Sequence, residues 1–244
     1  KTCIWCYLLT MLKKNLLIII PARSNSKAIK NKNLIKIFGK HLVYYAIKIA
    51  KKVKEKNKLI FCSTDSKKIK KVVEQYGLIV PFLRPKKYSK DLSRDIDFVN
   101  HAINEFYKNK IIFKYCLILR PTSPIRNLKN IDKAYKILQK SKNATSIRAV
   151  TNPKNNPFKT WVIKKGFLRP ILKSKIKEHY NAPRQILPKT YWQTGNFEFI
   201  KINFKKKLNS TSGKNILPFM ISGNEVLDID SFSDLENLKK NMFN

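Results

Sequence analysis

The stretch LLIIIPARSNSKAIKNKNL, residues 16–34, decides the expected fold. Its apolar run, Leu16–Ile20, predicts a strand, and Pro21 ends that strand because proline has no N–H to donate to a sheet. The polar residues that follow, through Asn33, are predicted to form a loop at the carboxyl end of the strand. Open α/β sheets bind their ligands at that edge, so this loop is the first candidate for a site.

Short apolar runs alternate with segments of helical periodicity over residues 16–150. This alternation is typical of crossover connections, and it predicts an α/β fold, doubly wound around a mostly parallel sheet. Two more strands are expected at 197–200 and 218–221, before a closing helix at 231–242 that Ser231 can cap. The earlier expected strands are 16–20, 59–62, 78–83, 115–119 and 145–150, and the expected helices are 42–53, 66–76, 95–107 and 130–139.

Residues 152–190 break this alternation. They hold five of the eleven prolines, with short aromatic stretches between them. We therefore expect one domain over residues 15–244 with residues 152–190 as an inserted arm. Because the apolar side chains of the arm need cover, a second subunit is a candidate partner for it.

The charge balance is extreme: 52 Lys and Arg against 15 Asp and Glu, a net charge of +37. Such an excess suggests a nucleic-acid partner. However, most of the basic residues are lysines spread along the whole chain, as an AT-rich genome would encode, so we expect mainly a solvated surface. A basic nucleic-acid-binding protein is the alternative of a different class, which tight binding to duplex DNA at about 200 mM salt with a steep salt dependence would support.

We expect no secretory signal at the amino terminus, because Lys13, Lys14 and Asn15 divide the early apolar stretch before it is long enough. We expect residues 1–14 to be an extension outside the fold, with Met11 as the true start, and no run in the chain approaches the roughly 18 apolar residues of a membrane span. Cys3 and Cys6 form a lone CxxC that lacks the second pair of a zinc site. With no signal, membrane span or cysteine framework, the expected location is the cytoplasm.

Two groups of polar residues carry candidate chemistry. Arg23, Lys27 and Lys32 lie in the loop after the first strand, which suits a polyphosphate, although no Walker motif is present. Asp228 and Asp230 are two residues apart, so in an extended segment they share one face and can bind one hard cation. A helix N-cap is the alternative role for this pair. Together the two groups predict a Mg²⁺-nucleotide site, as in a nucleotidyltransferase or a glycosyltransferase.

The motif IIIPARSNSKAIKNKNL at 18–34 resembles the opening of the acylneuraminate cytidylyltransferases, the CMP-N-acetylneuraminic acid synthetase family. The resemblance covers the chain from residue 16 to its end, and it implies a nucleotide-diphospho-sugar transferase fold of the GT-A type with a dimerisation arm. The remaining motifs follow in the family's order: STDS at 63–66, LRP at 83–85, SKD and VNHAI within 89–103, RPTSPIR at 120–126, NPFK at 156–159, PRQILP at 183–188 and DID at 228–230.

The resemblance also implies roles for individual residues. The expected nucleotide-binding residues are Arg23, Lys27, Lys32, Asn33, Arg84 and Asp91, the expected catalytic residues are Arg23, Lys32 and Asp228, and the expected Mg²⁺ ligands are Asp228 and Asp230. The expected substrate-binding residues are Arg120, Lys159, Arg184, Gln185 and Glu198, of which Lys159 would reach the site of a neighbouring subunit.

Three departures from the family pattern fall on the sugar side. Arg120 stands where the family has Gln, Thr194 where it has Asn, and Glu198 where it has Tyr. Because the nucleotide-side motifs match the family and these three sugar-side positions do not, the resemblance implies the use of CTP more strongly than the use of N-acetylneuraminate. Because Arg120 and Glu198 carry opposite charges, we expect them to pair in a reshaped pocket. A further departure, at 93–95, affects the expected ribose contacts.

The implied reaction joins CTP to a sialic-acid-like nonulosonic acid and gives the CMP-sugar and pyrophosphate. The anomeric hydroxyl attacks the α-phosphorus after activation by the metal or by Asp228, and the basic loop stabilises the departing pyrophosphate. Legionaminate, pseudaminate or an octulosonate are the alternative acceptors. The expected partners are CTP, the sugar acid and a second copy of the chain as a homodimer, with Mg²⁺ as cofactor and no membrane.

Overall fold

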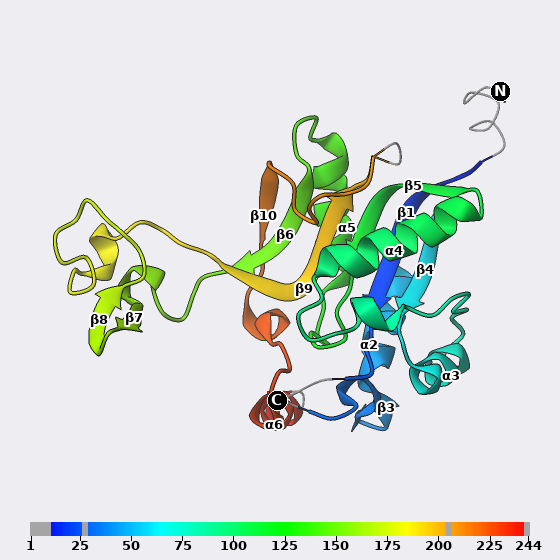
Figure 1. The fold of residues 1–244 in the computed structure, drawn as a ribbon, viewed down its shortest axis with the longest axis horizontal. Coiled ribbons are helices and arrows are strands. Elements are labelled where there is room, and N and C mark those ends of the chain that lie inside the picture. Colours follow the sequence, from blue (N-terminus) through cyan, green and yellow to red (C-terminus); the bar gives the residue numbers. More distant parts are fainter. Residues whose placement is uncertain (1–10, 26–28, 204–205, 242–244) are drawn as a thin grey trace.

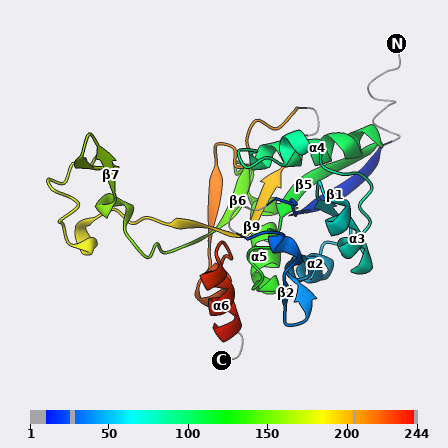
Figure 2. The same cartoon turned by 60° about the horizontal axis from the view of Figure 1, so that its bottom comes forward.

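A computed structural model describes residues 11–25, 29–203 and 206–241 of the chain. At its centre is a six-stranded sheet in the order β10-β6-β9-β5-β1-β4 (Figure 1). Helix α4 covers one face, and α2 and α5 cover the other (Figure 2). The sheet strands are β1 (Leu12–Pro21), β4 (Lys58–Ser63), β5 (Ile111–Ile118), β6 (Ser146–Thr151), β9 (Trp192–Lys201) and β10 (Ile216–Met220), and the helices are α2 (Leu42–Lys52), α3 (Lys67–Gln75), α4 (Asp95–Lys108), α5 (Leu128–Lys140) and α6 (Phe232–Asn241).

Strand β1 forms the core as the sequence predicts. Leu16–Ile20 are fully buried, and β1 pairs in parallel with β4 on one side and β5 on the other. At the carboxyl end Pro21 lies opposite Ser63, and Ala22 N donates to Ser63 O at 2.9 Å. The loops after β1, β4 and β5 therefore meet at one edge of the sheet.

Strand β9 runs antiparallel to both of its neighbours, while the other pairings in the sheet are parallel. Its register places Glu198 opposite Ile118 of β5 and opposite Arg148 of β6. Since Arg120 follows the end of β5, this register brings an acidic side chain under the edge of the sheet between two arginines.

Two expectations about the strands are wrong. Residues 12–14 belong to β1 and not to an extension, because Leu12, Lys13 and Lys14 pair with β5 through backbone groups whatever their side chains are. Residues 1–10 lie outside the described residues. The segment 78–83 is not a strand: Ile79 is exposed and Pro81 offers no N–H, so the segment crosses the edge of the core without joining the sheet.

The expected arm leaves the sheet between β6 and β9 and projects away from it (Figures 1 and 2). It carries the hairpin of β7 (Trp161–Lys164) and β8 (Phe167–Pro170), whose turn residues Lys165 and Gly166 both have positive φ, as tight hairpins require. The 3₁₀ turns η3 (Pro157–Lys159) and η4 (Arg184–Ile186) flank the hairpin.

The remaining small elements lie near the edge of the sheet that carries the loops. They are β2 (Lys36–Ile37), β3 (Lys40–His41) and the 3₁₀ turns η1 (Lys32–Leu34), η2 (Lys86–Tyr88) and η5 (Gly223–Val226). Ser231 caps α6 as predicted, since its Oγ accepts from Asp234 N at 3.3 Å while Ser231 N donates to Asp234 Oδ2 at 2.7 Å. Within the described ranges no helix is both long and apolar enough to cross a bilayer.

Candidate functional site

Five of the six residues predicted to bind nucleotide line one cleft of about 370 Å³. The cleft lies between the loop after β1 and the segments that precede α4. Those residues are Arg23, Lys32, Asn33, Arg84 and Asp91. The sixth, Lys27, lies outside the described residues. The structure thus brings together side chains that are up to 68 positions apart in the sequence.

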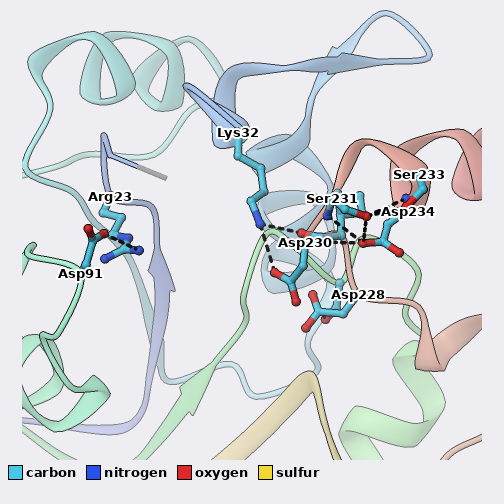
Figure 3. A network of polar contacts seen from close by, with 10 residues as sticks. Arg23, Lys32, Asp91, Asp228, Asp230, Ser231, Ser233 and Asp234 are labelled. Carbon is cyan, nitrogen blue, oxygen red and sulfur yellow. Dashed lines mark hydrogen bonds and ion pairs between the residues drawn. The ribbon is translucent and has the colours of Figure 1, made fainter. Parts of the chain in front are cut away.

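The loop after β1 is held in place by contacts with its neighbours. Arg23 donates to Lys90 O at 2.9 Å and forms an ion pair with Asp91 at 3.2 Å (Figure 3). Ser24 donates through its backbone N and its hydroxyl to the carboxylate of Asp65, at 2.8 and 2.6 Å. Asp65 was not singled out from the sequence, although it lies in the STDS motif directly after β4 and so belongs to the loops that meet here.

Arg84 is nearly fully buried at the back of this cleft. Its Nε and Nη2 donate to Ser63 Oγ and O at 2.9 and 2.6 Å, and its guanidinium lies 4.8 Å from the ring centre of Phe98. Burial lowers the pKa of Arg84 to about 10, so the side chain stays charged at neutral pH. It contributes a fixed positive charge to the wall of the cleft.

The carboxylate pair also lies where the sequence predicts. Asp228 and Asp230 line the nucleotide-side cleft, and Ile229 between them is fully buried, so the two carboxylates share the face opposite the core (Figure 3). Lys32 Nζ donates to Ile229 O at 2.7 Å and to Asp230 Oδ1 at 3.1 Å. The alternative role as an N-cap is filled by other residues, because Ser231 and its partner in the first turn cap α6.

The donor set of this pair fits Mg²⁺. A magnesium ion is commonly held by one or two carboxylates, with waters and substrate phosphates completing its shell. Asp228 accepts a hydrogen bond from Ser123 Oγ at 3.3 Å. Gly195 leaves room for its carboxylate, since a Cβ at position 195 would lie 2.5 Å from Asp228 Oδ2. Over the described part of the chain no cluster of three or more His, Cys, Asp or Glu side chains has a metal-binding arrangement.

A second, larger cleft of about 1120 Å³ adjoins the first. It is lined by Thr194, Gly195 and the stem of the arm, and it shares four residues with the nucleotide-side cleft. The shared residues are Asp95, Arg120, Asp228 and Asp230. The carboxylate pair therefore lies at the boundary of two clefts, where two substrates could meet.

The expected pairing of Arg120 and Glu198 is confirmed. Arg120 Nη2 donates to Glu198 Oε1 at 2.6 Å and also to Asp95, and Glu198 forms a second ion pair with Arg148. Burial lowers the pKa of Arg120, but the two carboxylates more than compensate and raise it above its ordinary value. Glu198 is only 2% exposed and lies beneath Arg120, so it contacts this arginine and does not line the cleft.

Arg126 is buried and connects the loop after β5 with β9. Its Nε donates to Asn196 O at 2.7 Å and its Nη2 to Arg120 O at 2.5 Å, which ties the loop after β5 to β9. Burial lowers the pKa of Arg126 to about 9, so it too is mainly charged at neutral pH. Sequence reasoning missed Arg126 and Arg148 as parts of the site, because the contacts of Arg126 with Asn196 and of Arg148 with Glu198 depend on the place of β9 in the sheet.

The residues predicted on the arm lie apart from this site within one subunit. Lys159 is the last residue of η3 and does not line the larger cleft. Arg184 and Gln185, in η4, line a separate cavity of about 390 Å³ with the stem of the arm. One chain therefore does not bring these three residues to the boundary that Arg120 occupies.

A mostly parallel sheet with a basic loop after its first strand and a carboxylate pair between two clefts defines a class, the nucleotidyltransferases of this α/β type. Comparison gives the family. The chain belongs to the cytidylyltransferase family, whose model matches residues 17–180.

Individual relatives agree with this family. The chain is 30% identical over 224 residues to a protein named post-translational flagellin modification protein B from Campylobacter coli, with 91% of this chain and 92% of that one covered. It is 29% identical to the pseudaminic acid cytidylyltransferase of Campylobacter jejuni strain 81-176, with 91% and 94% covered. Its fold is similar to that of a CMP:2-keto-3-deoxy-manno-octonic acid synthetase solved with CTP, with a TM-score of 0.68 at 14% identity over 94% of this chain and 98% of that one.

Proposed function

We propose that this cytidylyltransferase activates a nonulosonic acid, converting CTP and the sugar acid into the CMP-sugar and pyrophosphate. The observation that carries the proposal is the boundary between the two clefts, where Asp228 and Asp230 lie between the predicted nucleotide residues and the larger cleft. The names of the relatives support the substrate class. Pseudaminic acid is the first acceptor to test, ahead of N-acetylneuraminate, because several of the relatives are named for it.

The chain's own residues would perform the chemistry as follows. The anomeric hydroxyl of the acceptor attacks the α-phosphorus of CTP, the P–O bond to the β-phosphate breaks, and pyrophosphate leaves with its electron pair. Arg23 and Lys32 stabilise the negative charge that develops on the leaving group, after exchanging contacts to Asp91 and Asp230 for phosphate oxygens. Asp228 accepts the proton of the hydroxyl.

We also propose that Asp228 and Asp230 hold Mg²⁺. When bound, the ion would neutralise phosphate charge, which favours attack by a hydroxyl. Lys32 Nζ lies 3.1 Å from Asp230 Oδ1, so its positive charge offsets part of the repulsion between the two carboxylates.

A pyrophosphate-release assay tests this function. The full chain is incubated with CTP or GTP, with and without Mg²⁺, against pseudaminic acid, legionaminic acid, N-acetylneuraminic acid and an octulosonic acid. We expect release only with CTP, Mg²⁺ and a nonulosonic acid. Absence of release with every acceptor, or equal rates with the octulosonic acid, would overturn the proposed substrate class.

Two variants make the assay specific for the site. Asp228→Ala is expected to lose at least about a hundredfold in kcat/KM, the scale of removing one group that stabilises transition-state charge. Glu74→Ala is the matched control, since Glu74 lies on α3, lines neither cleft and has its side chain 3.8 Å from Lys70 of the same helix. Full activity of Asp228→Ala would show that the carboxylate pair is not the catalytic site.

We further propose that the chain acts as a homodimer joined through its arm. The hairpin exposes Ile163, Phe167 and Leu168, with 75%, 65% and 58% of each residue accessible. A second copy of the arm would cover these apolar side chains, and Lys159 could then reach the other subunit's site. Sedimentation velocity should show a dimer that Phe167→Lys dissociates, and a monomeric wild-type chain would refute this.

A further inference from the structure

Arg120 is an interior cation of the larger cleft. The charged residues that line this cleft in the described chain are four aspartates, at 95, 228, 230 and 234, and two cations. The other cation, Lys154, is exposed on the stem of the arm. A sugar acid that enters this cleft carries a carboxylate, so its best partner inside is the guanidinium of Arg120.

The two acidic partners of Arg120 differ in how firmly they are held. Glu198 is 2% exposed, lies in the middle of the sheet and is paired with Arg148 on its other side. Asp95 is the first residue of α4 and lines both clefts, and its side chain is 44% exposed. Glu198 therefore fixes Arg120, whereas Asp95 can rotate away from it at little cost.

The hydrogens of Arg120 decide what else it can bind. A carboxylate is bound most strongly by two neighbouring guanidinium nitrogens, one of which must be Nη2. Both Nη2 hydrogens are used, one by Glu198 and one by Asp95. A two-nitrogen contact with a ligand thus requires that one of the two acids give up its hydrogen bond, and Asp95 is the one that is held less firmly.

We infer that Arg120 recognises the carboxylate of the acceptor, and that Asp95 competes for the same face of its guanidinium as an internal carboxylate. This inference rests on the proposed function. Glu198 and Arg148 act as positioning residues that hold Arg120 at the boundary of the clefts. The two acidic neighbours of one arginine then have opposite effects on the acceptor, since one supports its binding and the other opposes it.

Steady-state kinetics with pseudaminic acid, at saturating CTP and Mg²⁺, test the inference. Asp95→Ala is expected to lower the KM for the acceptor by about fivefold, the scale of a half-exposed ion pair, with Asp95→Asn between it and the wild type. Glu198→Gln is expected to raise the same KM, and Arg120→Gln to raise it more. Glu74→Gln, which removes one negative charge from a residue that lines neither cleft, is the control and should leave the KM unchanged.

A double-mutant cycle separates competition at Arg120 from a general effect of charge. In the Arg120→Gln background, Asp95→Ala should no longer lower the KM for the acceptor. An equal effect in both backgrounds, an unchanged KM in Asp95→Ala, or a change confined to the Kd of CTP measured by calorimetry would each overturn the inference. If the wild type does not turn over any nonulosonic acid, the proposed function itself fails, which is a distinguishable result.

Discussion

Replacing Glu198 by Gln tests the buried charge network most directly. Removing one partner of a fully buried ion pair costs about 3–5 kcal/mol in the free energy of unfolding, because the other charge is left unpaired. Here two features reduce that cost. The side chains of Arg120 and Arg148 are 21% and 12% exposed, and Gln keeps one carbonyl oxygen that can accept from Arg120. We therefore expect a loss of about 2–3 kcal/mol.

Urea unfolding followed by circular dichroism measures this loss, and a thermal melt should show a decrease of about 5–10 °C in Tm. Asp95→Asn, which breaks the exposed half of the same network, should cost no more than about 1 kcal/mol. A Glu198→Gln chain within about 0.5 kcal/mol of the wild type would refute the view that the register of β9 makes Glu198 the anchor of Arg120.

Three further predictions concern other contacts. Asp65→Asn should raise the KM for CTP several-fold with little change in kcat, because one of the hydrogen bonds that hold Ser24 is weakened; an unchanged KM would contradict this. Gly195→Ala should reduce the rate of pyrophosphate release and weaken the binding of Mn²⁺ measured by electron paramagnetic resonance, because the added Cβ would displace the Asp228 carboxylate; Mn²⁺ binding equal to that of the wild type would refute this. Burial, and then the charge of Lys36, lower the pKa of His41 in the folded chain, so the unfolded chain binds the proton more readily. The free energy of unfolding should therefore decrease as the pH is lowered past about 6.5, and in urea titrations His41→Gln should make this decrease smaller.

The sequence predicts those parts of the fold where one local signal is sufficient. Five apolar residues that end at Pro21 predict a buried strand at Leu16–Ile20, and a loop after such a strand lies at the ligand-binding edge. The spacing of Asp228 and Asp230 predicts a shared face in any extended segment, and the structure shows it. These inferences need no knowledge of which strands are neighbours.

The parts that were not predicted depend on long-range pairing. Segment 78–83 is apolar enough for a strand, but it contains Pro81 and does not pair with β4, the edge strand of the sheet. Residues 12–14 look too polar for a strand, but β5 supplies backbone partners for them. The contact between Glu198 and Arg148 requires β9 to be antiparallel, and no local pattern reports strand direction.

The distribution of the acids explains why so basic a chain can still form a specific site. The chain has only 15 acidic residues, and three of those in or beneath the two clefts are paired with particular cations: Asp91 with Arg23, Asp230 with Lys32, and Glu198 with Arg120. Each of these cations would otherwise bind any anion with little selectivity. Because a substrate anion must replace an internal carboxylate, only a ligand that offers better geometry than that carboxylate gains net binding energy. The three paired acids therefore make the binding of anions by Arg23, Lys32 and Arg120 selective.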